Sequence, residues 1–270
     1  MTISPESADP IGIFDSGVGG LTVLAALRHR LPGESFIYLG DTARVPYGNK
    51  SPEVVTRYAF ENTLFLLDRG VKMVVIACNT ATAGSLCRLQ KHFRRPIVGV
   101  IEPGAGQAAL RSSSGVIGVI GTVGTIASGA YEQAIRRHRP SATVYSAACP
   151  LLVPLAEEGW LDHPASKLIV GEYLSPLLRY GIDVLLLGCT HYPLLRGLIA
   201  EQAGPGVQIL DSAVATAEVV AEQLDKLGLA RQPGEGGKVE FFLSDRHPHF
   251  KRLGERFLDA PIDEIHLVTY

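Results

Sequence analysis

Short apolar runs alternate with longer segments of helical spacing in the first part of the chain. The apolar runs are short enough to be buried strands: IGIFD (11–15), SFIYLG (35–40), KMVVIA (72–77) and IVGVIEP (97–103). One intervening segment, PEVVTRYAFENTLFLLDRG (52–70), has helical spacing, a proline near its start and a glycine after its last turn. This alternation predicts an α/β fold in which helices cover both faces of a parallel sheet.

The same alternation starts again after the polar stretch RSSSG (111–115). Three further strands are expected at GVIGVIG (115–121), ATVYSAA (142–148) and DVLLLG (183–188). Helices are expected at IASGAYEQAIRRH (126–138), ASKLIVGEYLSPLLRYG (165–181) and PLLRGLIAEQ (193–202). The tail adds a strand and a helix in VQILDSAVATAEVVAEQLDKLG (207–228), a loop at 232–237, a strand in VEFFLSD (239–245) and a closing helix in FKRLGERFLD (250–259).

The restart is an internal repeat. When GVKMVVIACNT (70–80) is written over GIDVLLLGCTH (181–191), the apolar positions agree and Cys78 falls on Cys189. When IGIFDSGVG (11–19) is written over IGVIGTVGT (117–125), Ser16 falls on Thr122. Both matches occur in the same order, which indicates two copies of one structural unit. The tail has no counterpart in either copy and is expected to complete one of the two lobes.

Composition narrows the class of protein. The chain has 270 residues, 46% of them hydrophobic and 19% charged, with a formal net charge of −2. Such a near-balance gives no electrostatic footprint for nucleic acid or for an anionic membrane. The first residues, MTISPESADP, lack the basic start and apolar centre of a signal peptide, and no apolar run has the length of a membrane span. We therefore expect a cytoplasmic protein whose thiols stay reduced.

The cysteines lie at positions 78, 87, 149 and 189, and none of them forms a C-x-x-C pair. This spacing disfavours a disulfide framework, a zinc site and a thioredoxin-like motif. Cys87 falls inside a helix expected over SLCRLQKHF (85–93) and Cys149 precedes a proline, so both are interpreted as packing residues.

Cys78 and Cys189 are placed differently, because each follows an apolar strand and precedes a predicted helix. In open α/β sheets, ligands bind outside the carboxyl ends of the strands. A helix N-terminus favours the thiolate form of a cysteine. Two related lobes that faced each other would place two such thiols across one cleft. That arrangement suits the inversion of a carbon centre, in which one group takes a proton from one face and a second delivers a proton to the other.

The neighbouring polar residues each allow a structural and a functional interpretation. Asp15 could cap the following helix or assist Cys78, and Ser16 and Thr122 could be caps or could hold a carboxylate. His191 could be a hydrogen-bonded structural histidine or could tune the Cys189 thiol. One Cys and one His in C-x-H are weak support for a metal, and the glycines of DSGVGG do not match a nucleotide-binding motif.

Several motifs in order resemble the glutamate racemase family of cofactor-independent racemases. They are DSGVGG (15–20), VPYG (45–48), ACNTA (77–81), GCTHYP (188–193) and the SD…F tail near 244–250. The resemblance implies two pseudo-symmetric, flavodoxin-like α/β lobes with mostly parallel sheets and the active site in the cleft between them. The first lobe would comprise residues 1–100 and 210–270, and the second lobe residues 101–209. The implied activity is an isomerase reaction that interconverts L- and D-glutamate and supplies D-glutamate for peptidoglycan.

Site residues follow from the same resemblance. Cys78 and Cys189 match the two catalytic bases, Asp15 and His191 match their assisting groups, and Glu157 matches the acidic partner of the histidine, with adjacent Glu158 as the alternative. The residues that match substrate contacts include the two assisting groups again: Asp15, Ser16, Tyr47, Gly48, Asn79, Thr80, Thr122, Thr125, Thr190 and His191. The resemblance implies a reaction without a cofactor and glutamate as the small-molecule partner. Cysteine spacing, charge balance and apolar run lengths give the expectation of no metal, no nucleic-acid partner and no membrane partner. The resemblance is compatible with a homodimer.

Three alternatives stay open from the residues. An aspartate or hydantoin racemase of the same superfamily would also use a cysteine pair. A two-lobed amino-acid-binding module would have the same architecture, but binding alone would not require thiols. A thiol redox protein would pair Cys78 with Cys189, which would consume both bases.

Overall fold

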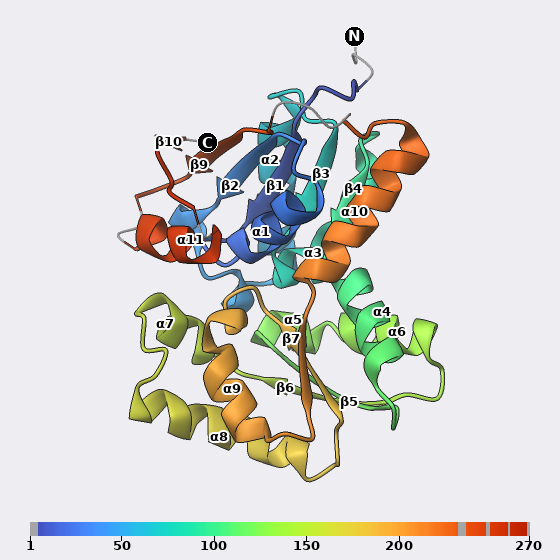
Figure 1. Ribbon diagram of the computed structural model, residues 1–270, viewed down its shortest axis with the longest axis vertical. Coiled ribbons are helices and arrows are strands. Elements are labelled where there is room, and N and C mark those ends of the chain that lie inside the picture. Colours follow the sequence, from blue (N-terminus) through green and yellow to red (C-terminus); the bar gives the residue numbers. More distant parts are fainter. Residues whose placement is uncertain (1–4, 232–235, 247–248, 259, 269–270) are drawn as a thin grey trace. The chain divides into compact units, whose positions relative to one another are not determined.

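The computed structural model describes residues 5–231, 236–246, 249–258 and 260–268. The chain divides into two compact units. Unit 1 contains the described residues up to Val100 and from Ala213 onward, and unit 2 contains Ile101–Ser212. Each unit is built around a parallel sheet, so the α/β fold class expected from the sequence is confirmed (Figure 1).

The sheet of unit 1 has six parallel strands in the order β10-β9-β2-β1-β3-β4. Their bounds are β1 Ile11–Asp15, β2 Phe36–Gly40, β3 Met73–Ile76, β4 Ile97–Gly99, β9 Val239–Leu243 and β10 Ile265–Leu267. The tail was expected to complete one lobe, but it is divided between the two units. Its first strand, Gln208–Asp211, joins the sheet of unit 2, where it is the counterpart of β4, and only β9 and β10 extend the sheet of unit 1 beyond β2. The apolar side chains on both faces of the sheet are buried, which is why the central strands read as continuous apolar runs.

Helices cover the two faces of this sheet. On one face α1 (Leu21–Arg30) contacts α10 (Ala213–Leu227) and α11 (Phe250–Leu258), and on the other α2 (Pro52–Leu67) contacts α3 (Asn79–His92). Aromatic residues fill both layers. Tyr38 packs against Phe250 on the first face, whereas Phe242 packs against Phe65 on the second.

The sheet of unit 2 has four parallel strands in the order β6-β5-β7-β8. Their bounds are β5 Val116–Gly121, β6 Thr143–Ala148, β7 Val184–Gly188 and β8 Gln208–Asp211. The helices of this unit are α4 Ile101–Arg111, α5 Val123–Ala127, α6 Ala130–His138, α7 Leu152–Glu157, α8 Pro164–Leu178 and α9 Arg196–Ala203. Helix α4 packs on α6, while α8 packs on α7 and α9.

The internal repeat appears as a repeat of topology. The order β2-β1-β3-β4 in unit 1 is the order β6-β5-β7-β8 in unit 2, and it is the order of flavodoxin-like sheets. The registers agree as well, because Gly12 lies beside Val74 in unit 1 and Gly118 lies beside Leu185 in unit 2. These are the pairs that the sequence alignment of the two copies predicts.

Two expected elements differ from the structure. The strand expected over 97–103 ends at Gly99, and residues 101–111 form α4, which the sequence reading did not predict. Its glycines and alanines lack a clear amphipathic pattern, and Pro103 is tolerated because it lies in the first turn. The helix expected over 126–138 is broken at Gly129, which adopts a positive φ of 64° before α6 begins. Part of the loop expected at 232–237 lies outside the described residues.

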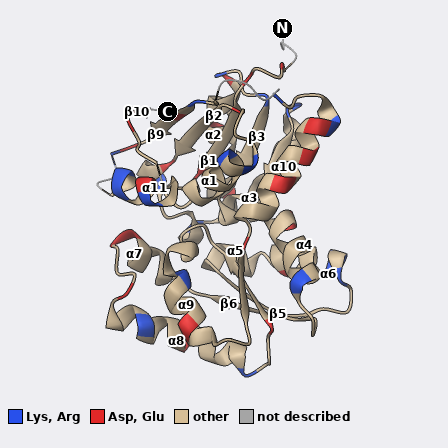
Figure 2. Ribbon diagram, in the orientation of Figure 1, with Lys and Arg blue, Asp and Glu red and all other residues tan. Residues whose placement is uncertain are grey.

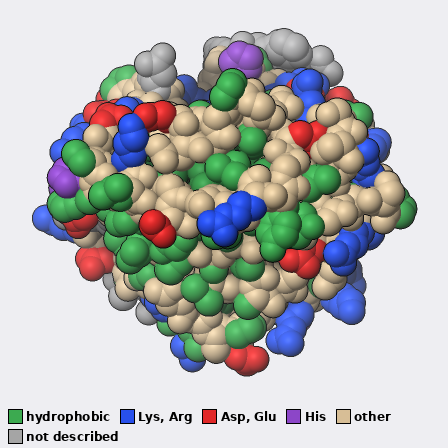
Figure 3. All heavy atoms as spheres, turned by 90° about the horizontal axis from the view of Figure 1, so that it is seen from below, with side chains coloured by type: hydrophobic (Ala, Val, Ile, Leu, Met, Phe, Trp, Pro, Cys, Tyr) green, Lys and Arg blue, Asp and Glu red, His purple; other side chains and the backbone are tan. Residues whose placement is uncertain are grey.

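Charged side chains lie mainly on helices and loops (Figure 2). Within the described strands only Asp15, Asp211 and Glu240 carry a charge. On the face drawn in Figure 3, lysines and arginines are mixed with acidic residues, so that face has no extended basic field of the kind that binds nucleic acid. Among the described helices, none combines the length and the apolarity that a membrane span requires.

Candidate active site

The carboxyl ends of β1 and β3 bring Asp15 and Cys78 together in unit 1. The two strands are neighbours, with Phe14 beside Ile76, and the Ala77 amide donates to the Phe14 carbonyl at 2.9 Å. Both Asp15 and Cys78 are buried. The strand order changes direction between β1 and β3, and such a switch point is where open α/β sheets bind ligands.

Cys78 is the N-cap residue of α3, a helix of 14 residues. Its Sγ atom accepts a hydrogen bond from the Ala81 amide at 3.5 Å. The N–H groups of the first turn and the helix dipole both favour negative charge at this position, so the local structure stabilises a Cys78 thiolate.

Asp15 holds the glycine turn that precedes α1. Its Oδ2 atom accepts hydrogen bonds from the Gly17 and Gly20 amides, each at 3.0 Å. A Cβ atom on Gly20 would lie 2.5 Å from the Asp15 Cβ, so this turn requires glycine. Asp15 also lies near Cys78, because the two residues follow register partners at the ends of neighbouring strands. Burial, followed by the charges of Asp15 and Cys78, raises the pKa of Tyr38. The capping and assisting roles of Asp15 are therefore compatible with each other.

The other predicted contacts of unit 1 lie around the same edge. Ser16 follows Asp15, and Asn79 and Thr80 occupy the first two positions of α3; all three are buried. Tyr47 and Gly48 belong to the short 3-10 helix η2 (Tyr47–Asn49), which contacts α3. The Tyr47 hydroxyl donates to Asp41 and accepts from the Asn62 side chain at 3.0 Å. Because that hydroxyl is occupied within unit 1, the backbone of this loop is better placed than the Tyr47 side chain to contact a substrate.

Unit 2 repeats the arrangement at the ends of β5 and β7. Gly121 lies beside Gly188, so Thr122 and Cys189 follow neighbouring strands at a second switch point. Thr122 caps α5, where its Oγ1 atom accepts from the Thr125 amide at 3.2 Å, and the two hydroxyls lie 3.0 Å apart. Thr122, Thr125, Cys189 and Thr190 are all buried.

Cys189 is followed in a chain of contacts by a histidine and then a glutamate. His191 Nδ1 lies 3.9 Å from the Cys189 Sγ atom, and His191 Nε2 lies 3.1 Å from Glu157 Oε1. Burial alone would lower the pKa of His191, but the hydrogen bonds to Cys189 and Glu157 outweigh burial and raise it to about 10. A protonated imidazole next to the sulfur stabilises the Cys189 thiolate. The partner of His191 in the structure is Glu157, whereas Glu158 is the C-cap residue of α7.

The two cysteines differ in the helix that follows each of them. The sequence predicts helices over 85–93 and 193–202, some residues after the two cysteines. In the structure α3 already begins at Asn79, directly after Cys78. Cys189 is followed by a 3-10 helix, η3 (Tyr192–Leu195), and α9 begins only at Arg196. Without a long helix that starts at Cys189, the charge of His191 takes the place of the helix N-terminus.

The other two cysteines differ from each other. Cys149 is completely buried, and burial followed by the nearby Cys189 raises its pKa to about 12, so it stays a thiol. Its interpretation as a packing residue is confirmed. Cys87 is exposed on α3, and its interpretation as a packing residue is wrong. Helical spacing alone did not reveal which face of α3 would be covered.

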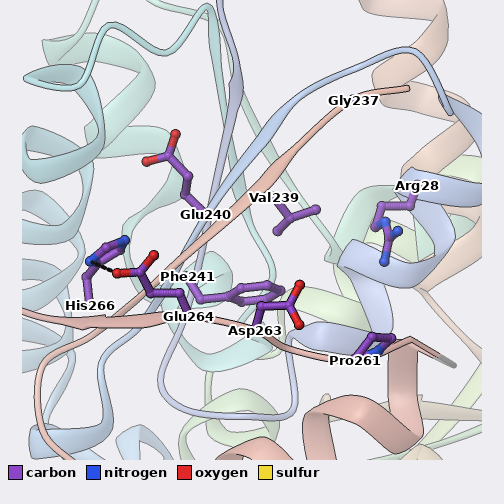
Figure 4. A pocket seen from close by; sticks show the side chains of 9 residues that line it. All are labelled: Arg28, Gly237, Val239, Glu240, Phe241, Pro261, Asp263, Glu264 and His266. Atoms are coloured by element: carbon purple, nitrogen blue, oxygen red, sulfur yellow. Dashed lines mark ion pairs between the residues drawn. The ribbon is translucent and has the colours of Figure 1, made fainter. Parts of the chain in front are cut away.

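A separate hollow of about 250 Å³ lies at the other end of the unit 1 sheet (Figure 4). It is lined by Arg28 at the end of α1, by the first residues of β9 and by Asp263, Glu264 and His266 around β10. Parallel α/β sheets build their sites at the opposite, carboxyl ends of the strands, so this hollow is not a candidate for the chemistry. Across the described ranges, no group of His, Cys, Asp and Glu has the arrangement of a metal site.

Sequence reasoning did not identify several polar residues that support the site. Tyr38 donates to the Gly17 carbonyl at 2.7 Å, and Asp41 accepts hydrogen bonds from the Arg44 Nε atom at 2.9 and 2.7 Å. Asp41 and Arg44 lie just before the VPYG motif, and that position was the available signal.

Comparisons with known proteins find similar sequences over nearly the whole chain. The family model described as Asp/Glu/Hydantoin racemase matches residues 21–220. The glutamate racemase of Geobacter metallireducens is 53% identical over 259 residues, which is 96% of each chain.

Two solved structures are similar over nearly the whole chain. The glutamate racemase isoform RacE1 of Bacillus anthracis has a TM-score of 0.93 at 40% identity, covering 97% of this chain and 98% of that one. The glutamate racemase of Francisella tularensis in complex with D-glutamate has a TM-score of 0.91 at 34% identity, with the same coverage.

Proposed function

The chain belongs to the Asp/Glu/hydantoin racemase family, and on that premise we propose that it is a glutamate racemase that interconverts L- and D-glutamate. The observation that carries the proposal is the pair of buried thiols, Cys78 and Cys189, one at the switch point of each repeated sheet. A binding module would not require a thiolate-stabilising group beside each of two cysteines. A two-base racemase requires two groups that exchange one proton each with opposite faces of a carbon.

The reaction is a balanced transfer of two protons. One thiolate removes the α-proton of glutamate and becomes a thiol, and the other thiol delivers its proton to the opposite face and becomes a thiolate. The reverse reaction uses the same groups in exchanged roles. Asp15 assists Cys78, and His191 with Glu157 assists Cys189. The α3 N-terminus favours the thiolate form of Cys78, and the His191 imidazolium favours the thiolate form of Cys189. Either sulfur can therefore act as the base, depending on the direction of the reaction.

Substrate binding would rest on neutral donors rather than on a basic patch. Hydroxyl, amide and backbone N–H groups at helix starts can hold carboxylates. The residues proposed for this role are Asp15, Ser16, Tyr47, Gly48, Asn79, Thr80, Thr122, Thr125, Thr190 and His191. Tyr47 and Gly48 would contribute through their backbone.

The biological role proposed is the supply of D-glutamate for peptidoglycan in the cytoplasm, without a cofactor. Members of this family supply the acid and base from cysteines, and the strand-end motifs of this chain contain no lysine for a pyridoxal Schiff base. The resemblance is compatible with a homodimer, and size-exclusion chromatography with light scattering would test it.

The experiment is polarimetry of L-glutamate incubated with purified, dialysed protein. We expect the optical activity to fall to zero without added cofactor, because the two enantiomers have equal free energy in solution. Parallel reactions with L-aspartate test the alternative within the family. A stable signal with L-glutamate together with decay for L-aspartate would replace the proposed substrate, and stable signals for both would contradict the assignment as a racemase of either amino acid.

A further inference from the structure

The C-terminal segment reaches the carboxyl edge of the unit 1 sheet, where the candidate site lies. Strand β9 runs parallel to β2, with Gly40 beside Leu243. Strand β2 in turn runs parallel to β1, with Gly40 beside Asp15. The residues that follow β9 therefore emerge beside the loop that connects β2 to Tyr47.

Two residues of the tail clasp this loop. The Ser244 amide donates to the Gly40 carbonyl at 3.1 Å, and the Ala43 amide donates to Ser244 Oγ at 2.9 Å. The Asp245 amide donates to Thr42 Oγ1 at 3.0 Å, and the Thr42 hydroxyl donates to the Asp245 carbonyl at 2.5 Å. The tail thus fixes both the backbone and a side chain of the loop.

The same serine completes the shell of a buried charge. Ser244 Oγ donates to Asp41 Oδ1 at 2.8 Å, and the Asp41 side chain is inaccessible to solvent. Its other described partners are Arg44 and the Tyr47 hydroxyl. A buried carboxylate that loses a donor must move or recruit another partner, because an unsatisfied buried charge is costly.

Any such movement would reach the candidate site through Tyr47. The Tyr47 hydroxyl binds Asp41, and Tyr47 belongs to the same buried cluster as Cys78. Burial, then Asp41, and then Cys78 raise the pKa of Tyr47, which is consistent with its position between the carboxylate and the thiol. The backbone of η2 therefore takes its position from Asp41, and Asp41 takes one of its donors from the tail.

We propose that Ser244 is a positioning residue that sets the Tyr47–Gly48 backbone for substrate binding through Asp41. This inference rests on the proposed function. Ser244 touches neither thiol in this scheme, so it acts on binding rather than on proton transfer.

The test is Ser244→Ala, with KM and kcat for glutamate measured in both directions. We expect KM to rise about tenfold in each direction, since a hydrogen bond to a charged group is worth roughly that factor. The value of kcat should stay nearly constant. Thr42→Val removes the side-chain bonds to Asp245 and leaves Asp41 its donors, so it should raise KM by a smaller factor.

Ser35→Ala is the matched control. Ser35 Oγ accepts from Arg231 Nη1 at 3.0 Å and from the Lys238 amide at 3.3 Å, so it ties the same tail to the opposite, amino end of β2. We expect Ser35→Ala and Ser244→Ala to lower the urea midpoint similarly, but only Ser244→Ala to raise KM.

Each outcome separates the inference from the function on which it rests. A wild-type enzyme that racemises glutamate, with KM unchanged in Ser244→Ala and Thr42→Val, would overturn the inference alone. An equal rise of KM in Ser35→Ala would also overturn it, because the effect would then be general loss of stability. A wild-type protein that does not racemise glutamate would overturn the proposed function and the inference together.

Discussion

Each of the two units has a thiol at the equivalent point of its own sheet, but the two thiolates are stabilised differently. Cys78 caps a helix of 14 residues and lies near a carboxylate held by two glycine amides. Cys189 precedes a 3-10 helix and lies 3.9 Å from an imidazole that is backed by Glu157. Strand order and register are shared, and the residues after the strands differ. The two units therefore share a scaffold, and the loop after each strand favours a thiolate through different groups.

The opposite ends of the same strands show a second difference. Lys72 and Asp183 occupy equivalent positions in the repeat, just before β3 and β7. Lys72 is fully buried and donates to Glu34 at 2.6 Å and to the Ser7 and Leu229 carbonyls. Asp183 is less buried and accepts from the Ser112 hydroxyl and from the Ser113 and Ser114 amides. Both residues anchor connecting segments, so we assign stability to the amino ends of the strands and chemistry to the carboxyl ends.

The largest effect is expected when either thiol is removed. Cys78→Ala and Cys189→Ala should each reduce racemisation by about a thousandfold or more, because each deletes the proton carrier of one face. Circular dichroism should show an intact fold in both. Cys87→Ala is the control and should keep both activity and stability, since Cys87 is exposed. If one of the two variants racemised at a rate near that of the wild type, a single base would suffice and the requirement for both thiols would be contradicted.

Removal of the Lys72 charge should destabilise the protein without altering the chemistry. Lys72→Met breaks a buried ion pair and should cost about 3–5 kcal/mol of unfolding free energy. Urea unfolding measures this loss, and kcat/KM per folded molecule should stay unchanged. Asp183→Asn should cost less, because Asp183 is more accessible. A fall in kcat/KM of folded Lys72→Met would show that the two ends of β3 are coupled.

The assisting groups should matter less than the thiols. Asp15→Asn and His191→Asn should each lower kcat/KM by about a hundredfold, within the usual range for acid–base assistance. The loss must be equal in the two directions, since the equilibrium constant between enantiomers is unity. The separate kcat values should shift with opposite asymmetry in the two variants. Asymmetry in the same sense would contradict one helper for each thiol.

The pH dependence of stability should distinguish unit 2 from unit 1. His191 has a pKa raised to about 10 from an ordinary value of 6.5. A raised pKa means that the protonated histidine stabilises the fold, fully below pH 6.5 and progressively less as the pH rises through about 10. Urea unfolding of wild type and His191→Asn at a series of pH values should therefore give a difference that shrinks toward alkaline pH. A difference independent of pH would contradict this prediction, because it would mean that folding leaves the pKa of His191 unchanged.

Some of this could be predicted from the sequence, and the reasons are physical. Short apolar runs and their repeat identify the strands and place Cys78 and Cys189 at strand ends, because these signals are local. The partnership of Ser244 with Asp41 could not be predicted, since it joins residues about 200 positions apart that meet only when β9 pairs with β2. The 3-10 helix Tyr192–Leu195 before α9 was also missed, because CTHYPLL carries no strong stop signal before the helical spacing begins.

The central claim is that one proton is taken by one thiol and a different proton is given by the other. The direct measurement is racemisation of L-glutamate in deuterated water, with the α-carbon of both enantiomers analysed by mass spectrometry at early times. Thiol protons exchange with solvent between turnovers, so D-glutamate should carry deuterium while the remaining L-glutamate carries little. Equal early labelling of the two enantiomers would point to a single base, and unlabelled D-glutamate would indicate internal return of the same hydrogen; either result would contradict the two-thiol account.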